Sequence, residues 1–104
     1  MAQFTLMPAT GVATVGSSVN ISTRTTQVSL QFTPQPALGF SGVVVIDSSS
    51  APNPGISDWF PVATLTFSSH TSSVAINLYV SNNPWLRARI VDPTIGSMSV
   101  YMAF

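Results

Sequence analysis

The stretch Pro84–Val91, with the sequence PWLRARIV, concentrates the side chains of this chain that could do chemistry. It holds two of the three arginines, Arg87 and Arg89, next to Trp85. A guanidinium group binds carboxylates and phosphates through a rigid fork of N–H donors, and Arg and Trp are both common anchors of protein interfaces. Two functions are therefore open for these arginines. They form an exposed patch that recognises an anionic partner, or they pair with carboxylates and hold an assembly together.

The spacing of the two arginines predicts that they project from the same face of a β-strand. Arg87 and Arg89 alternate with the apolar residues Leu86, Ala88 and Ile90, and side chains of a strand alternate between its two faces. If the arginine face is buried, each guanidinium needs a carboxylate or carbonyl partner, because an unpaired buried charge is very costly. The chain has three aspartates for its three arginines. Pairing between them is therefore the structural interpretation.

Residues suited to catalysis are few. The chain has no Cys, and its one histidine, His70, lies in the segment SSHTS between two expected strands, without a Gly-x-Ser-x-Gly pattern elsewhere. Paired-carboxylate hydrolysis would have to use two of Asp47, Asp58 and Asp92, and the last two lie at ordinary turn positions. No metal-ligand spacing and no phosphate loop is present. We therefore expect that the protein is not an enzyme and that it binds no metal and no cofactor. A hydrolase built on His70 is a remote alternative.

Four aromatic residues could form a platform that stacks on sugars: Trp59, Trp85, Tyr79 and Tyr101. Both tryptophans, however, stand at expected strand starts behind Asp58 and Pro84, where large aromatic side chains more often anchor a core or an interface. We therefore favour an anchoring role and keep a carbohydrate-binding β-sandwich as an alternative function. The expected interface and anchor residues are Trp59, Trp85, Arg87, Arg89, Tyr101 and Phe104.

The composition indicates one domain whose surface associates with neighbours. The 104 residues carry 6% charged side chains and no formal net charge, with 27 Ser and Thr and a mean hydropathy of +0.40. Surfaces with so little charge tend to associate. Apolar runs such as Val43–Ile46 are far shorter than the ~18–20 residues of a membrane span, and a neutral chain lacks the basic surface that nucleic acids require. We expect neither a membrane nor a nucleic-acid partner, and synthesis in the cytoplasm because no secretory signal opens the chain.

Alternation with a period of two runs through most of the chain and predicts strands. The runs are Gln27–Thr33, Val62–Phe67, Ser73–Val80, Leu86–Asp92 and Met98–Phe104. Prolines and glycines separate them, with Ser48–Asp58 as the longest loop and with hairpin-length connections at Ser68–Ser72 and Asp92–Ser97. This pattern predicts an all-β fold, an antiparallel β-sandwich (jelly-roll or Ig-like) of about seven to eight short strands. We expect a single domain over residues 1–104, in which residues 1–26 alternate weakly and could form a looser N-terminal arm.

A set of residues between Val43 and Phe104 forms a recognisable pattern. Its members are Trp59, Pro61, the run Ala63–Thr66, Pro84, Trp85, Arg87 or Arg89, Ala88, Gly96 and Val100. The pattern resembles that of small β-sandwich virion proteins of tailed bacteriophages. The chain departs from it in the loop Ser48–Asp58, where a turn with Asp-Gly is more usual, and the first forty residues lie outside it.

The resemblance implies a structural protein of a bacteriophage particle. A capsid decoration or cement protein that binds and stabilises the shell suits a single domain of this size, and a neck, tail or fibre component is the alternative. The expected partners are the major capsid protein or other virion proteins, together with further copies of this chain, a trimer being favoured. The expected location is the virion, after synthesis in the host cytoplasm.

Overall fold

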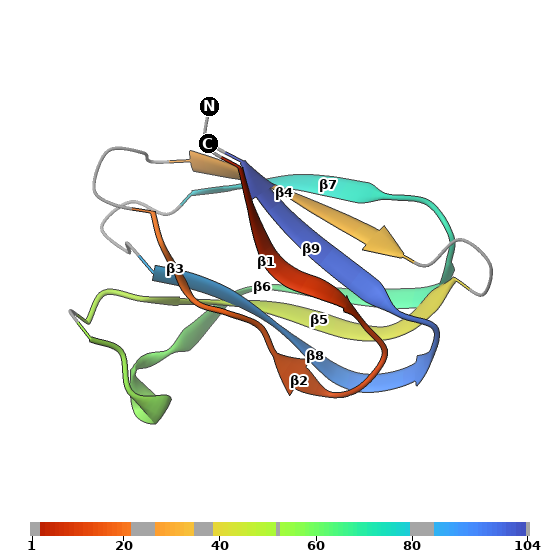
Figure 1. Ribbon diagram of the computed structural model, residues 1–104, viewed down its shortest axis with the longest axis horizontal. Helices are drawn as coiled ribbons and strands as arrows, with labels where there is room; N and C mark the ends of the chain where they lie inside the picture. The colour runs from red at the N-terminus through yellow and green to blue at the C-terminus, as the bar shows by residue number, and fades with distance from the viewer. Residues whose placement is uncertain (1–2, 22–26, 35–38, 52, 80–84, 104) are drawn as a thin grey trace.

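Two antiparallel β-sheets pack face to face in the computed structural model, which describes residues 3–21, 27–34, 39–51, 53–79 and 85–103 (Figure 1). The strands of the described residues are β1 (Gln3–Thr10), β2 (Thr14–Val15), β3 (Val19–Asn20), β4 (Gln27–Pro34), β5 (Phe40–Ser49), β6 (Phe60–His70), β7 (Val74–Tyr79), β8 (Trp85–Ile95) and β9 (Met98–Ala103). One 3-10 turn, η1 (Ile56–Asp58), lies between β5 and β6. The predicted antiparallel β-sandwich is confirmed.

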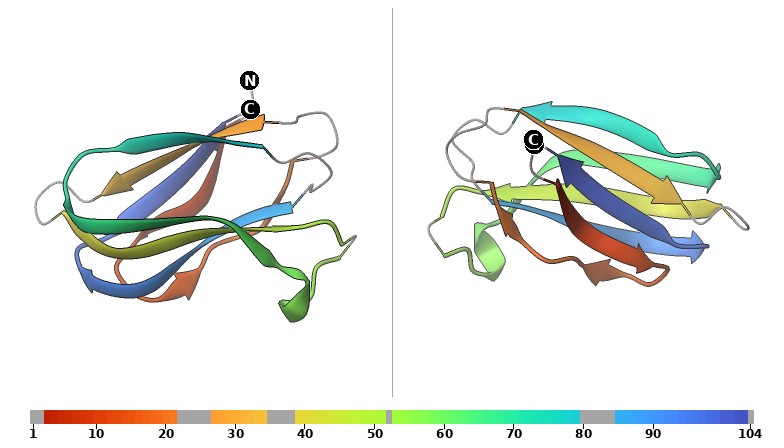
Figure 2. Two further views of the ribbon diagram at one scale, coloured as in Figure 1. Left: turned by 180° about the vertical axis from the view of Figure 1, so that it is seen from behind. Right: turned by 45° about the horizontal axis from the view of Figure 1, so that its top comes forward.

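The strand order differs from the chain order because most connections cross from one sheet to the other. One sheet has the order β1-β9-β4-β7, and the second has the order β2-β8-β5-β6, with β3 also paired to β8. Figure 2 shows the two layers from behind and from a tilted view, with the chain passing repeatedly between them. Residues that are far apart in the sequence therefore become neighbours on one sheet face.

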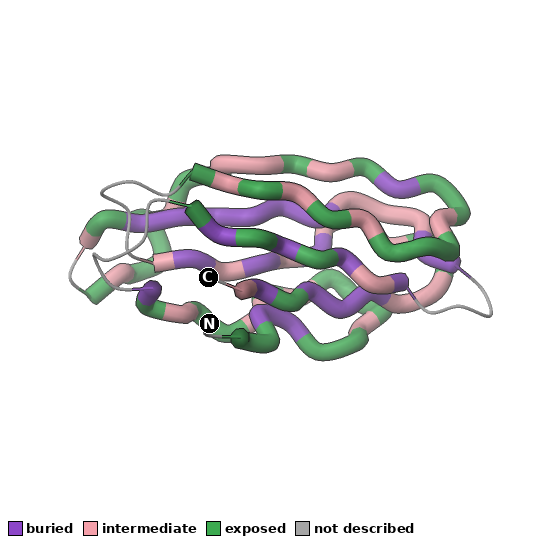
Figure 3. The backbone as a smooth tube through the Cα atoms, turned by 90° about the horizontal axis from the view of Figure 1, so that it is seen from above, coloured by how far each residue is buried: buried purple, intermediate pink, exposed green. Residues whose placement is uncertain are grey.

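The core lies between the sheets and follows the predicted alternation. In β4 the buried residues Val28, Leu30 and Phe32 alternate with polar ones that are exposed or partly exposed. The first part of β8 alternates between buried and partly buried residues, whereas β9 also buries Ser99 between two apolar neighbours. Phe67 of β6 connects the layers, with its ring centroid 6.0 Å from that of Phe32 and 5.9 Å from that of Phe40. Figure 3 shows buried segments alternating with exposed or partly exposed ones along the strands. Burial of one face of each sheet thus stabilises the sandwich.

Two predicted connections are wrong in their extent, because the strands continue through them. β8 runs to Ile95 although Asp92 and Pro93 were expected in a turn, and β6 runs to His70. Asp92 has a left-handed φ of 51°, and the pairing of β8 with β5 shifts its register between Val91 and Ile95. A local bulge therefore absorbs the turn-forming residues without ending the strand.

Residues 3–21 contribute to both sheets. β1 pairs with β9 and brings Leu6 and Met7 into the core, while β2 and β3 pair with β8. Ile21 is also buried in the core cluster. In the part of the chain that the structure describes, no helix is long and apolar enough to cross a membrane.

Candidate protein interface

The arginines of β8 share one strand face, as their spacing predicted, and this face is the outer one of the five-stranded sheet. Leu86, Ala88 and Ile90 are buried against the other sheet, so the alternating positions Arg87 and Arg89 point away from the core. In the pairing of β8 with the central strand β5, Asp47 stands opposite Arg87 and Val45 stands opposite Arg89. The register therefore brings one carboxylate next to both arginines.

Asp47 pairs with both guanidinium groups through a single oxygen. Its Oδ2 accepts a hydrogen bond from Nε of Arg87 at 3.1 Å and from Nε of Arg89 at 2.8 Å. The carboxylate is only 2% exposed, while the arginine side chains are 21% and 34% exposed. The two arginines thus cover the carboxylate, and a buried charge with two such partners avoids the cost of an unpaired ion.

The ring of Trp59 packs against Arg87 and so adds an aromatic side chain to this group. The guanidinium carbon of Arg87 lies 4.4 Å from the centroid of the Trp59 ring, a cation–π contact. The turn η1 positions the tryptophan: Gly55 N donates to Oδ2 of Asp58 at 2.7 Å, and Asp58 N donates to the Gly55 carbonyl oxygen at 3.2 Å. We call the residues Asp47, Arg87, Arg89 and Trp59 the arginine cluster.

An open pocket and exposed apolar side chains adjoin the arginine cluster. The pocket has a volume of about 300 Å³ and is lined by Arg87, Trp59, Ser18, Pro54, Ile56 and two glycines. Ile56 is 98% exposed, and Val15, which stands opposite Arg89 in the register, is also exposed. Aromatic and arginine side chains beside apolar ones are typical of the centre of a protein interface. The exposed carboxylate of Asp58, the neighbour of Trp59 in the chain, lies beside this pocket and accepts a hydrogen bond from Gly55 N.

The arginine cluster has a positive net charge and hydrogen-bond donors that Asp47 does not use. Two guanidinium groups and one carboxylate leave a net charge of plus one. Both ion pairs with Asp47 are made through Nε, so they leave the terminal nitrogens of Arg87 and Arg89 unused by this carboxylate. Such half-exposed guanidinium groups can receive a carboxylate from a partner in a bidentate pair.

The structure brings four of the six predicted anchor residues to one side of the sandwich. Trp85 begins β8 and is half-buried two positions before Arg87, so the alternation places it on the same face as Arg87, Arg89 and Trp59. Its carbonyl oxygen accepts a hydrogen bond from the Ser48 hydroxyl at 3.0 Å. Tyr101 lies on β9 and faces the opposite side of the molecule. Phe104 lies outside the described residues.

The other residues whose side chains could take part in chemistry lie apart from one another in the structure. His70 ends β6 and makes a T-shaped ring contact with Phe67, with the ring centroids 5.3 Å apart. Asp58 is used by the backbone of its own turn, and Asp92 is exposed on β8. No group of three or more His, Cys, Asp or Glu side chains that could hold a metal ion occurs in the described ranges. The ring face of Trp59 that Arg87 covers is not open for stacking on a sugar.

The comparison with solved structures supports the fold. No protein-family model matches the chain, and no curated protein matches its sequence. The chain is similar in structure to the SPBc2 prophage-derived protein YomS, with a TM-score of 0.70 and 10% sequence identity. The match covers 97% of this chain and 88% of that one. Two chains that differ at nine positions in ten thus share one β-sandwich over nearly their full length.

Proposed function

We propose that this chain is a structural protein of a bacteriophage particle, a decoration or cement protein that binds the capsid and stabilises it. Three observations support the proposal. The fold is similar to that of a prophage-derived protein. The residues from Trp59 to Val100 resemble those of small β-sandwich virion proteins. The surface has little charge and carries the arginine cluster, which has the composition of an interface.

The arginine cluster is the observation that carries the proposal. Arg87 is held rigid from two sides, by Asp47 and by the Trp59 ring, so little side-chain entropy remains to be lost when a partner docks on it. Ile56 and Val15 supply exposed apolar area beside it. In this mechanism a carboxylate of the major capsid protein pairs with the terminal nitrogens of the arginines while apolar side chains fill the adjacent pocket. The bound protein then links neighbouring shell subunits passively, by added contact area.

The first test measures the mass of the purified protein by light scattering, alone and mixed with purified phage capsids. We expect a trimer, or a protein that becomes one on the shell, and saturation of the capsids at a fixed copy number. A stable monomer that ignores capsids would contradict the proposal. Binding is also measured with separate fractions of capsids and of tails. A decoration protein should bind the capsid fraction, whereas a neck, tail or fibre component should bind the tail fraction.

The second test places a charge on the proposed surface without disturbing the fold. Ile56→Asp should reduce the affinity for capsids by at least about tenfold, since it puts a carboxylate in an apolar contact, where each 1.4 kcal/mol is a factor of ten. Ile56 is almost fully exposed, so the stability of the variant should be unchanged. The matched control is Tyr79→Asp, an exposed position on β7 in the other sheet, which should leave capsid binding intact. Equal loss in both variants would show that the arginine cluster is not the contact.

A further inference from the structure

The outer face of the four-stranded sheet differs in chemistry from the arginine cluster on the other side of the sandwich. None of its strands β1, β4, β7 and β9 contains an Asp, Glu, Lys, Arg or His. Its outward positions are instead amides, hydroxyls, short alanines and the rings of Tyr79 and Tyr101. An uncharged face cannot select an ion by charge, so its specificity has to come from hydrogen bonds and stacking.

The register of β1, β9 and β4 builds a hollow on this face. One row across the strands consists of Gln3, Ala103 and Ser29. The neighbouring row consists of Thr5, Tyr101 and Gln31. Ala103 and Ser29 are short and lie beside three long side chains, because positions two apart on a strand share a face.

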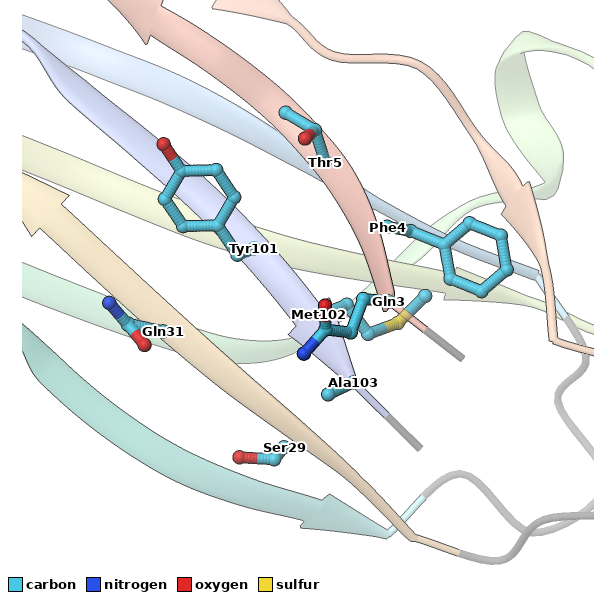
Figure 4. Close-up of a pocket in the computed structure, with 8 residues that line it drawn as sticks. All are labelled: Gln3, Phe4, Thr5, Ser29, Gln31, Tyr101, Met102 and Ala103. Atoms are coloured by element: carbon cyan, nitrogen blue, oxygen red, sulfur yellow. The ribbon is translucent and has the colours of Figure 1, made fainter. Parts of the chain in front are cut away.

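These residues line an open pocket of about 460 Å³, within the range of roughly 300–1,000 Å³ that is typical of small-ligand sites. Figure 4 shows the Tyr101 ring lying over β9 between Thr5 and Gln31, with Ser29 and Ala103 further along the strands. Tyr101 is 42% exposed, so a large part of its ring is open to a ligand. The small side chains form the floor, and the long ones form the rim.

The hydrogen-bonding groups around the hollow are neutral and partly oriented. The Gln31 side chain donates through Nε2 to the Thr33 hydroxyl at 3.1 Å, and that hydroxyl lies 3.2 Å from the Ser73 hydroxyl. This chain of contacts holds the Gln31 amide beside Tyr101. A held amide offers its carbonyl oxygen as an acceptor and its second N–H as a donor, and Ser29, Thr5 and Gln3 add further donors and acceptors.

From this geometry we propose that the pocket lined by Gln3, Ser29, Gln31 and Tyr101 binds a neutral oligosaccharide. A sugar ring presents an apolar C–H face that stacks on an aromatic ring and an edge of hydroxyl groups that pair with amides and hydroxyls. Both kinds of group meet in this hollow, and no charged group adjoins them on the four strands. This site lies on the far side of the sandwich from the arginine cluster, so the inference does not depend on the proposed function.

The test is a titration of the ¹⁵N-labelled protein with maltohexaose, cellohexaose and chitohexaose, followed by two-dimensional NMR. At least one of them should shift the amide signals of β1, β4 and β9 and the side-chain NH₂ signals of Gln3 and Gln31. Tyr101→Ala should weaken that binding by about tenfold or more, and Tyr101→Phe, which keeps the ring, by only a few-fold. The control Tyr79→Ala removes an exposed ring of the same sheet outside the pocket and should not alter the affinity.

Several outcomes would overturn the inference. One is the absence of shifts with all three sugars, and another is binding that Tyr101→Ala does not weaken. Tighter binding of oligogalacturonate than of the neutral sugars would assign the pocket to anions. Shifts of the same signals that grow with protein concentration, without sugar, would assign the face to a second copy of this chain. Capsid binding by Tyr101→Ala is measured in parallel, because its retention separates this site from the arginine cluster.

Discussion

The Oδ2 atom of Asp47 lies 2.8 Å from Nε of Arg89, although the two residues are 42 positions apart in the chain. The same oxygen accepts a hydrogen bond from Arg87, whose guanidinium stacks on Trp59. One buried carboxylate on a central strand therefore organises most of the charged side chains of this face.

Replacing the shared carboxylate should destabilise the protein. Asp47→Asn leaves two guanidinium groups without their ionic partner, and we expect the free energy of unfolding to fall by about 2–3 kcal/mol, less than for a fully buried pair because the arginines are partly exposed. Urea unfolding followed by far-UV circular dichroism measures the change. The control is Asp92→Asn, which removes an exposed carboxylate at a left-handed φ that Asn tolerates well, and it should be neutral. Equal stability of both variants would refute a structural role for Asp47.

The contact between Arg87 and Trp59 should appear as a coupling energy. A double-mutant cycle with Arg87→Ala and Trp59→Leu should give about 0.5–1 kcal/mol, the usual strength of a partly exposed cation–π contact. The unfolding free energies of the four proteins provide the value. The same cycle with Arg89→Ala should give a smaller coupling, since Arg89 has no ring contact with Trp59 among the described residues. A larger coupling for Arg89 would mean that the two arginines exchange roles in solution.

The turn between β8 and β9 should tolerate only glycine at Gly96. Its φ is +75°, and a Cβ built there would overlap the carbonyl oxygen of Gly39. Gly96→Ala should therefore cost about 3 kcal/mol or more, from backbone strain and from the shift of neighbouring backbone. Thermal unfolding measures the effect. Gly55→Ala is the matched control: its Cβ would meet only Asp58 Oδ2 at 3.4 Å, so a cost above about 0.5 kcal/mol there would show that the comparison fails.

Phe67 should be among the most sensitive positions of the core. It contacts Phe32 in the opposite sheet and Phe40 in its own, so Phe67→Ala removes a ring that links the two layers. We expect a loss of about 3–4 kcal/mol in the free energy of unfolding, from lost burial and the cavity left behind. Phe67→Leu, which fills part of that cavity, should cost clearly less. The ordering of the two variants in urea unfolding checks the prediction, and an effect of equal size would argue against the cavity as its cause.

Much of the fold could be predicted from local pattern, and the errors lie at strand ends. The alternation in Gln27–Thr33 and Leu86–Asp92 predicted both the strands and their buried faces, because neighbouring residues of a strand must point to opposite sides. The segment Asp92–Ser97 was expected to be a turn, since Asp, Pro and Gly favour turns. Pairing with β5 extends β8 through most of it instead. Tertiary hydrogen bonds therefore outweighed the local preference.

The candidate interface, too, could be predicted from the sequence only in part. The sequence by itself determined that Arg87 and Arg89 share a strand face, that each would need a carboxylate or carbonyl partner if that face were buried, and that the chain has few charges for such pairing. It did not determine that Asp47 alone serves both, that Trp59 stacks on Arg87, or that Tyr101 lies on the opposite face beside Gln31. Each of these depends on the register between strands that are distant in the chain, on how the turn before β6 packs beside β8, or on which sheet a strand joins. Register is decided by how the whole core packs, because a slip of one residue would turn every buried side chain toward solvent.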